Sequence, residues 1–220
     1  TRAFAITKSN KIIYVAFNDY VMGFDIKTGL QILKFRDQNI KITYLDILSN
    51  ILIIGYESGS LYLLDLSQID QNNSQEITGT KEKRMYIHQK AISCINHNKN
   101  ETRLLIGSVD KIISVVDIVN NLIVYKLSGH KEKINYLQFY ELNEQFILSL
   151  SDDFSFKIWD TNIQKCIYTF SDTANKLTSF IRIDSTILFG TFTHEILLYN
   201  LNLDSYSNIE FINEINNSDN

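Results

Sequence analysis

The sequence predicts an all-β protein in which a unit of four short strands repeats about five times. Runs of about six residues rich in Val, Ile, Leu, Phe and Tyr alternate with turns rich in Asn, Asp, Ser and Gly. No stretch of a dozen residues keeps apolar side chains at the i, i+3, i+4, i+7 spacing of a helix. One two-residue pattern also recurs every forty-odd residues, and such a period is typical of repeated supersecondary units.

The recurring pattern is an aromatic or aliphatic residue followed by Asp or Asn, and it marks the third strand of each unit. Its copies are Phe24-Asp25, Leu64-Asp65, Val116-Asp117, Trp159-Asp160 and Tyr199-Asn200, separated by 40, 52, 43 and 40 residues. Apolar runs before these pairs predict second strands near 12–17, 51–56, 104–109, 146–151 and 187–192. Spaced apolar residues at 42–47, 92–97, 134–139 and 177–180 predict first strands, and runs at 30–35, 122–127 and 165–170 predict fourth strands.

With 220 residues and 45% apolar side chains, the chain can bury a substantial core and fits one large domain or two small ones. Because the repeats cover nearly the whole chain, we expect a single domain. The predicted units are approximately 1–36, 37–87, 88–128, 129–171 and 172–213, followed by a disordered tail at 214–220. The 52-residue interval predicts an inserted polar loop at 66–85, with a partner-binding arm as the alternative. Since the first residue is Thr1 rather than Met, we expect a piece of a longer protein.

Composition excludes several classes of protein. A net charge of −4 with 21% charged residues leaves no basic footprint for nucleic acid or an anionic membrane. No apolar run approaches the roughly 18 residues of a membrane span, and no signal peptide opens the chain. Cys94 and Cys166 are too few for a disulfide scaffold, so we expect buried, reduced thiols. The expected location is intracellular, in the cytoplasm, with the nucleus and the cytoskeleton as alternatives.

The fourth unit resembles a WD repeat. It reads SGHKEKINYLQFYELNEQFILSLSDDFSFKIWD at 128–160, with Gly129-His130 leading to Trp159-Asp160. A Gly-His to Trp-Asp pattern with four strands per 40–45 residues is the signature of a propeller blade. The resemblance implies an all-β protein, a β-propeller segment of about five four-stranded antiparallel WD-like blades. Because WD propellers most often close with seven blades, it also implies a portion of a larger propeller.

The resemblance further implies a buried hydrogen-bond chain in each blade that keeps the motif residues of the family. This chain links the histidine, a strand Ser or Thr, a turn Asp and the Trp. In the fourth unit these positions are His130, Ser151, Asp153 and Trp159. The third unit keeps His88, Ser108 and Asp110, with Val116 in the Trp position. The residue types suit this role, since a neutral imidazole can donate to a carboxylate while accepting from a hydroxyl, and a buried indole N–H needs an acceptor.

A Ser, His and Asp in one chain also raise the possibility of a hydrolase. A nucleophile must be exposed beside an oxyanion hole, whereas this constellation recurs imperfectly from repeat to repeat, as a structural device does. A metal site from His88, Cys94 and His97 is excluded by distance, because a strand over 91–97 separates the two histidines by roughly 25–30 Å. We therefore expect no enzyme activity, no metal and no cofactor.

The resemblance places a partner-binding face on the loops that enter the innermost strands and on the turns between second and third strands. The residues carried over are Phe17, Asn39, Lys41, Glu57, Gln89, Ala91, Val109, Lys131, Lys133, Asp152, Ala174, Lys176 and Phe192. Four lysines around apolar residues at 17, 109 and 192 suit an acidic peptide, or a mixed one with an apolar anchor. The alternative is a scatter of solvated loop lysines.

The expected function is a non-enzymatic scaffold for protein–protein interaction that helps to assemble a multiprotein complex. The alternative is a propeller subunit that contacts RNA within a ribonucleoprotein assembly. Clustered Arg and Lys with aromatic residues on one face would favour RNA, and the acidic balance of the chain argues against it.

Overall fold

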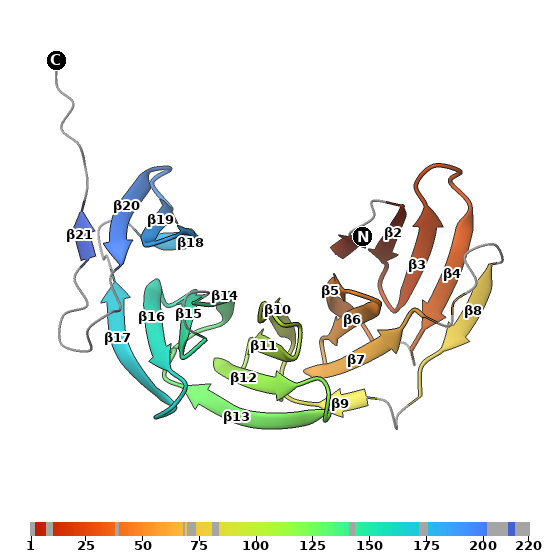
Figure 1. Ribbon diagram of the computed structural model, residues 1–220, viewed down its shortest axis with the longest axis horizontal. Coiled ribbons are helices and arrows are strands. Elements are labelled where there is room, and N and C mark those ends of the chain that lie inside the picture. Colours follow the sequence, from red (N-terminus) through yellow and green to blue (C-terminus); the bar gives the residue numbers. More distant parts are fainter. Residues whose placement is uncertain are drawn as a thin grey trace, which may run out of the picture.

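The computed structural model describes residues 3–7, 11–37, 40–67, 69, 74–80, 84–140, 144–171, 176–201 and 211–213. Every regular element in these ranges is a β-strand, and the strands form five sheets. Figure 1 shows the sheets arranged side by side around an arc, with the first and last sheets at its two ends. The prediction of an all-β propeller segment with five blades is confirmed.

The strands of each blade follow one another antiparallel from the centre of the arc to its rim. Blade 1 has β1 (Ala3–Ile6), β2 (Ile12–Ala16), β3 (Tyr20–Asp25) and β4 (Gln31–Arg36), and blade 2 has β5 (Ile42–Leu48), β6 (Ile51–Tyr56), β7 (Ser60–Asp65) and β9 (Arg84–Tyr86). Blade 3 has β10 (Ile92–His97), β11 (Arg103–Ser108), β12 (Ile112–Asp117) and β13 (Leu122–Ser128), and blade 4 has β14 (Ile134–Phe139), β15 (Phe146–Ser151), β16 (Ser155–Asp160) and β17 (Lys165–Ser171). Blade 5 has β18 (Leu177–Ile183), β19 (Thr186–Thr191), β20 (Ile196–Leu201) and β21 (Phe211–Asn213).

The hydrophobic core of the described residues falls into four clusters, each shared mainly by two consecutive blades. The middle strands are covered on both faces, so they read as continuous apolar runs, and every residue of β15 is buried. Side chains also link the innermost strands, since the Thr43 hydroxyl donates to the Ile92 carbonyl at 2.7 Å and the Ser93 hydroxyl to that of Ile134 at 2.5 Å. Stability therefore comes from packing between neighbouring blades, as in other repeat proteins.

Glycines mark a close approach between consecutive blades. Gly107 lies at the bulge between β10 and β11, opposite Cys94. A Cβ atom there would lie 2.6 Å from Cys94 Sγ and 2.9 Å from Ile134 Cγ2, so only glycine fits. Gly55 lies at the matching place in blade 2, where an added Cβ atom would lie 3.0 Å from Ile92 Cγ2 of blade 3.

The segment 66–85 differs from the predicted inserted loop. Residues Gln75–Thr78 form β8, which pairs in parallel with β4 and makes blade 1 five-stranded. We call residues 74–80 the strap. The chain leaves blade 2 after β7, returns to the rim of blade 1 in β8, and goes back to blade 2 in β9, a path that Figure 1 shows in yellow. Residues 68, 70–73 and 81–83 of this segment, and the predicted tail at 214–220, lie outside the described residues.

The strap is held because blade 1 offers it both an open strand edge and apolar surface. Ile69 belongs to the core cluster of blades 1 and 2, and Ile77 packs against that cluster. Lys34 and Glu76 form an ion pair of 2.8 Å across β4 and β8. Beyond the strap, Arg84 and Asp37 form an ion pair whose side chains are 2% and 0% exposed.

Candidate functional site

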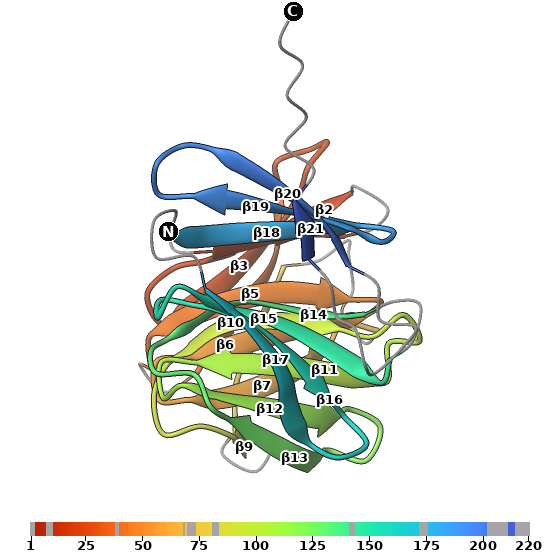
Figure 2. The same cartoon turned by 90° about the vertical axis from the view of Figure 1, so that its left-hand side faces the viewer.

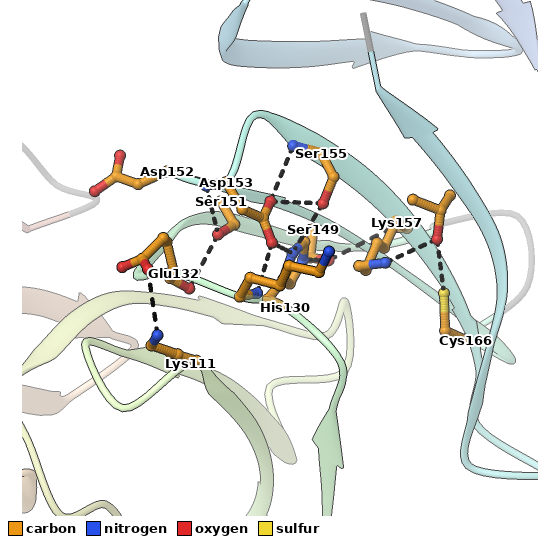
Figure 3. Close-up of polar contacts among 12 residues, drawn as sticks. Lys111, His130, Glu132, Ser149, Ser151, Asp152, Asp153, Ser155, Lys157 and Cys166 are labelled. Carbon is orange, nitrogen blue, oxygen red and sulfur yellow. Dashed lines mark hydrogen bonds and ion pairs between the residues drawn. The ribbon is translucent and has the colours of Figure 1, made fainter. Parts of the chain in front are cut away.

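The hydrogen-bond chain of blade 4 joins the loop before β14 to the two middle strands of the blade (Figure 3). The Nδ1 atom of His130 lies 3.1 Å from Asp153 Oδ2, and its Nε2 atom lies 2.8 Å from Ser149 Oγ. The indole N–H of Trp159 donates to the same Ser149 Oγ at 2.7 Å. We call His130, Asp153, Ser149 and Trp159 the blade 4 clasp.

The serine of the clasp is Ser149, and the assignment of Ser151 to this place was wrong. Ser151 instead donates to the Glu132 carbonyl at 3.0 Å and accepts from the N–H of Asp153 at 3.2 Å, which shapes the turn after β15. Both serines point to the same face of β15, because they are two residues apart. Trp159 pairs with Ile147, so Ser149 is its diagonal neighbour and Ser151 lies one step farther away.

The charges of the clasp are fixed by its surroundings. Burial lowers the pKa of His130, and the Asp153 carboxylate offsets this only in part, so the imidazole is neutral at pH 7. Burial alone would raise the pKa of Asp153, but hydrogen bonds from the Lys131 N–H and from Ser155 outweigh it and lower the pKa to about 2. Neutral His130 then donates from Nδ1 to Asp153 and accepts the Ser149 hydroxyl at Nε2, which leaves Ser149 Oγ free to accept from Trp159.

Blade 3 keeps only the outer half of this arrangement. His88 Nδ1 lies 3.0 Å from Asp110 Oδ2, and the Gln89 N–H donates to the same carboxylate oxygen at 3.0 Å. Ser108 shapes the turn as Ser151 does, accepting from the Asp110 N–H at 3.0 Å. Ile106 and Val116 stand where blade 4 has Ser149 and Trp159. His88 Nε2 is therefore buried without a hydrogen bond to any described side chain.

Blades 2 and 5 replace the turn aspartate by pairs of hydroxyl groups. In blade 2, Ser58 Oγ lies 2.7 Å from Ser60 Oγ, and in blade 5, Thr191 Oγ1 lies 2.9 Å from Thr193 Oγ1. Such pairs order the turn without a histidine. The turn is therefore kept in all four of these blades, whereas only blade 4 has the complete clasp.

Ser149, His130 and Asp153 lie in the order of a catalytic triad, yet they cannot reach a substrate. Ser149 is 0% exposed, and its oxygen already accepts the indole N–H of Trp159. A nucleophilic serine needs an open approach for the scissile group and an oxyanion hole beside it. Within the described ranges, no three His, Cys, Asp or Glu side chains are placed to share a metal ion. No described element is a helix long and apolar enough to cross a membrane.

The predicted partner-binding residues meet in pairs at one side of the arc. In four blades the backbone N–H of the residue just after the second strand donates to the backbone carbonyl of the residue just before the first strand. These bonds are Glu57 to Lys41 at 2.8 Å, Val109 to Ala91 at 3.0 Å, Asp152 to Lys133 at 2.8 Å and Phe192 to Lys176 at 2.9 Å. Figure 2 shows the strands running across the arc, with the connecting loops gathered on its two sides. Asn39 and Ala174 lie outside the described residues.

We call the surface formed by Phe17, Lys41, Glu57, Gln89, Val109, Lys131, Lys133, Asp152, Lys176 and Phe192 the turn face. Its charges are mixed, because Lys41 pairs with Glu57 at 3.0 Å and Asp152 accepts from the Asn135 amide. Lys176 Nζ lies 4.9 Å from the ring centroid of Phe154.

The apolar part of the turn face is smaller than the sequence suggested. Phe192 is 69% exposed, but Val109 and Phe17 are half-buried, and Phe17 stacks on Tyr20 with ring centroids 4.9 Å apart. The expectation of three exposed apolar residues therefore holds at Phe192 alone. Sequence spacing locates these residues on the face without showing which neighbours cover them.

Five blades, two of which have a hydrogen bond between a histidine and a turn aspartate, define a β-propeller segment built from WD-type units. The family model described as "WD domain, G-beta repeat" matches residues 79–117 and 121–160. The chain as a whole is similar to the WD-repeat β-propeller family. Propellers of this family are in general protein-interaction scaffolds.

Curated relatives match the chain over fewer than 100 residues each. "WD repeat-containing protein 89 homolog" of Dictyostelium discoideum is 39% identical over 92 residues, which are 41% of this chain and 24% of that protein. A "guanine nucleotide-binding protein subunit beta-like protein" of Encephalitozoon cuniculi is 28% identical over 88 residues, 38% of this chain and 26% of that protein. The matched region thus spans about a quarter of these relatives.

Solved structures share the fold over most of the chain. A chain in the "Crystal Structure of Mitotic Checkpoint Complex" superimposes with a TM-score of 0.75 at 13% identity, covering 94% of this chain and 62% of that one. The computationally designed Ika8 protein gives a TM-score of 0.70 at 18% identity, covering 89% and 57%. Identities this low show the fold alone.

Proposed function

We propose that this chain is a non-enzymatic platform that helps to assemble a multiprotein complex, and that its partner binds the turn face. The observation that carries the proposal is the backbone hydrogen bond repeated in four blades. It joins each turn to the neighbouring strand entry, so the side chains of the turn face project from a rigid frame. A rigid surface loses little conformational entropy when it binds a partner.

The chemistry of the turn face favours a peptide with carboxylates near an apolar side chain. Lys131 and Lys176 are exposed, and Phe192 beside Lys176 is an apolar anchor with 69% of its surface open. An incoming carboxylate can also compete with Glu57 for Lys41, whose side chain is 33% exposed. RNA has less support, because Glu57 and Asp152 interrupt the lysines.

We also propose that the protein is intracellular, and two further observations support a non-enzymatic, intracellular role. The arrangement of Ser149, His130 and Asp153 is sealed by Trp159 and has no open approach. Cys94 and Cys166 are free thiols, and burial raises the pKa of Cys94 to about 12, which keeps it unreactive. Reduced cysteines suit a reducing compartment.

The test is a charge reversal on the turn face. Lys41, Lys133 and Lys176 are changed together to Glu, and partners captured from an extract of the source cell are quantified by mass spectrometry. We expect about tenfold weaker capture, with the largest loss at low salt, because reversed charges repel an acidic partner. Circular dichroism should show an unchanged fold, since all three side chains lie at loops.

A matched control reverses three exposed lysines on the opposite side of the arc, Lys27 and Lys99 at loops and Lys165 at the first residue of β17. The control variant has the same net charge as the test variant and should capture the partner as the wild type does. Equal capture by wild type and test variant would place the binding site elsewhere, and residues 66–85 would be the next candidate.

A further inference from the structure

The outer strand of blade 3 presents an apolar edge. Strand β13 is the last strand of its sheet and lies on the outer rim of the arc (Figure 1). Leu122 is 60% exposed, Ile123 38% and Val124 45%, and Val119 in the preceding turn is 72% exposed. An unpaired edge of this kind offers a row of free backbone N–H and C=O groups beside apolar side chains, which is a template for another strand.

Blade 1 shows how such an edge is covered. Strands β4 and β13 carry the same bulge: β4 skips Ile32 between Leu33 and Gln31, and β13 skips Val124 between Tyr125 and Ile123. Ile32 is 3% exposed and belongs to the core cluster against which Ile77 of the strap packs. Val124, at the matching position of blade 3, is 45% exposed. The two edges have the same shape, and only that of blade 1 has an added strand among the described residues.

Both strands also carry a lysine two residues after the residue that bulges. Lys34 on β4 lies opposite Met22, and Lys126 on β13 lies opposite Ser114, so the two lysines occupy the same place in their blades. Lys34 pairs with Glu76 of the strap at 2.8 Å. Lys126 donates to the Ile87 carbonyl, and an ammonium group keeps two further N–H donors for an acidic residue.

We propose that the β13 edge is a docking site for an extended strand of a partner protein. The strand adds parallel to β13, as β8 adds to β4, and carries an acidic residue followed by an apolar one, as Glu76-Ile77 does. Backbone hydrogen bonds supply the pairing, Lys126 selects the acidic residue, and the apolar residue lies opposite Leu127, as Ile77 lies opposite Phe35. This site lies on the rim and does not depend on the turn face.

The probe is a synthetic peptide with the strap sequence Ser-Gln-Glu-Ile-Thr-Gly-Thr, labelled at its N-terminus with a nitroxide. It is added to the ¹⁵N-labelled full chain, and paramagnetic broadening of backbone amide signals locates it. We expect broadening across residues 122–128, because the peptide supplies the strand that blade 3 lacks. A peptide with Pro in the Ile77 position should not bind, since proline has no N–H to donate. A peptide with Lys in the Glu76 position should bind about fivefold more weakly.

The matched variants are Val124→Lys, on the edge strand, and Val119→Lys, in the exposed turn of the same blade. Val124→Lys should abolish the broadening and Val119→Lys should leave it, and circular dichroism checks that both fold.

Three results with the peptide would overturn the proposal: no broadening at residues 122–128, broadening confined to β4, or equal binding to both variants. Broadening of residues 122–128 that depends on protein concentration without peptide would assign the edge to a second copy of this chain, and would also overturn it. The lysine reversals on the turn face should not change peptide binding, so the two proposals fail separately.

Discussion

At the scale of single residues, His130 and His88 show how one residue type serves two different environments. Both donate from Nδ1 to a turn aspartate, but only His130 has a side-chain partner at Nε2. The sequence pattern identified both histidines and both aspartates. It could not separate Ser149 from Ser151, because the choice depends on the register between β15 and β16 and not on residue type.

Removing the clasp serine should destabilise the protein. Ser149→Ala leaves the Trp159 N–H and His130 Nε2 buried without their partner, and it should lower the free energy of unfolding by about 1–3 kcal/mol. Trp159→Ala should cost about 3–5 kcal/mol, because it also opens a cavity in the cluster between blades 3 and 4. Urea unfolding followed by circular dichroism measures both values, and wild-type stability of Ser149→Ala would contradict the proposed role of the serine.

The two buried histidines should make stability depend on pH. Burial lowers the pKa of His88 and of His130 from 6.5, so the unfolded chain takes up protons at a higher pH than the folded chain. Their contribution is complete above pH 6.5 and is lost as the pH falls below it, by at most about 1.4 kcal/mol per pH unit for each histidine. Asp153, with a pKa of about 2, adds a second loss between about pH 4 and pH 2.

The measurement is the free energy of unfolding in urea at pH 7.5 and at pH 5.5. Wild type should be less stable at the lower pH, and the double variant His88→Gln/His130→Gln should show a flatter dependence. An equal loss in both proteins would show that other groups carry the effect.

At the scale of secondary-structure elements, the sequence predicts a polar loop over 66–85, whereas the strap within that segment forms strand β8. The segment 66–85 that contains the strap is mostly polar, as expected for a loop, and its described residues Leu66, Ile69 and Ile77 contact the core cluster of blades 1 and 2. Its pairing with β4 and the ion pair between Asp37 and Arg84 join residues more than 40 positions apart. Contacts of that range leave no periodic signal, so the repeat pattern identified every four-stranded blade but not the fifth strand of blade 1.

Removing one partner of the buried ion pair between Arg84 and Asp37 should destabilise the protein. Arg84→Met leaves the Asp37 carboxylate buried without its partner and should lower the free energy of unfolding by about 3–5 kcal/mol. The double variant Asp37→Leu/Arg84→Met removes both charges and should recover most of that loss. Lys34→Met breaks the exposed pair with Glu76 on the strap and should change stability much less. Thermal unfolding of the four proteins gives the comparison, and a double variant no more stable than Arg84→Met would contradict this account.

At the scale of the whole molecule, the five blades follow from the repeat period and from the apolar runs before each Asp or Asn pair. Predicted second strands lie within one residue of β2, β6, β11, β15 and β19. The turn face was less predictable, because spacing places Lys41 and Glu57 on one surface but does not show that they pair. Charge pairing depends on side-chain geometry that the period does not contain.

The strap also determines the order in which the blades can be completed during synthesis on the ribosome. The first four strands of blade 1 have emerged once Arg36 has left the ribosome, but β8 follows only after β5, β6 and β7 of blade 2. At 5–20 residues per second, the chain between Arg36 and Thr78 takes about 2–8 seconds to make. During that time the edge of β4 stays open to strands of neighbouring nascent chains, and it closes only when the chain has turned back on itself.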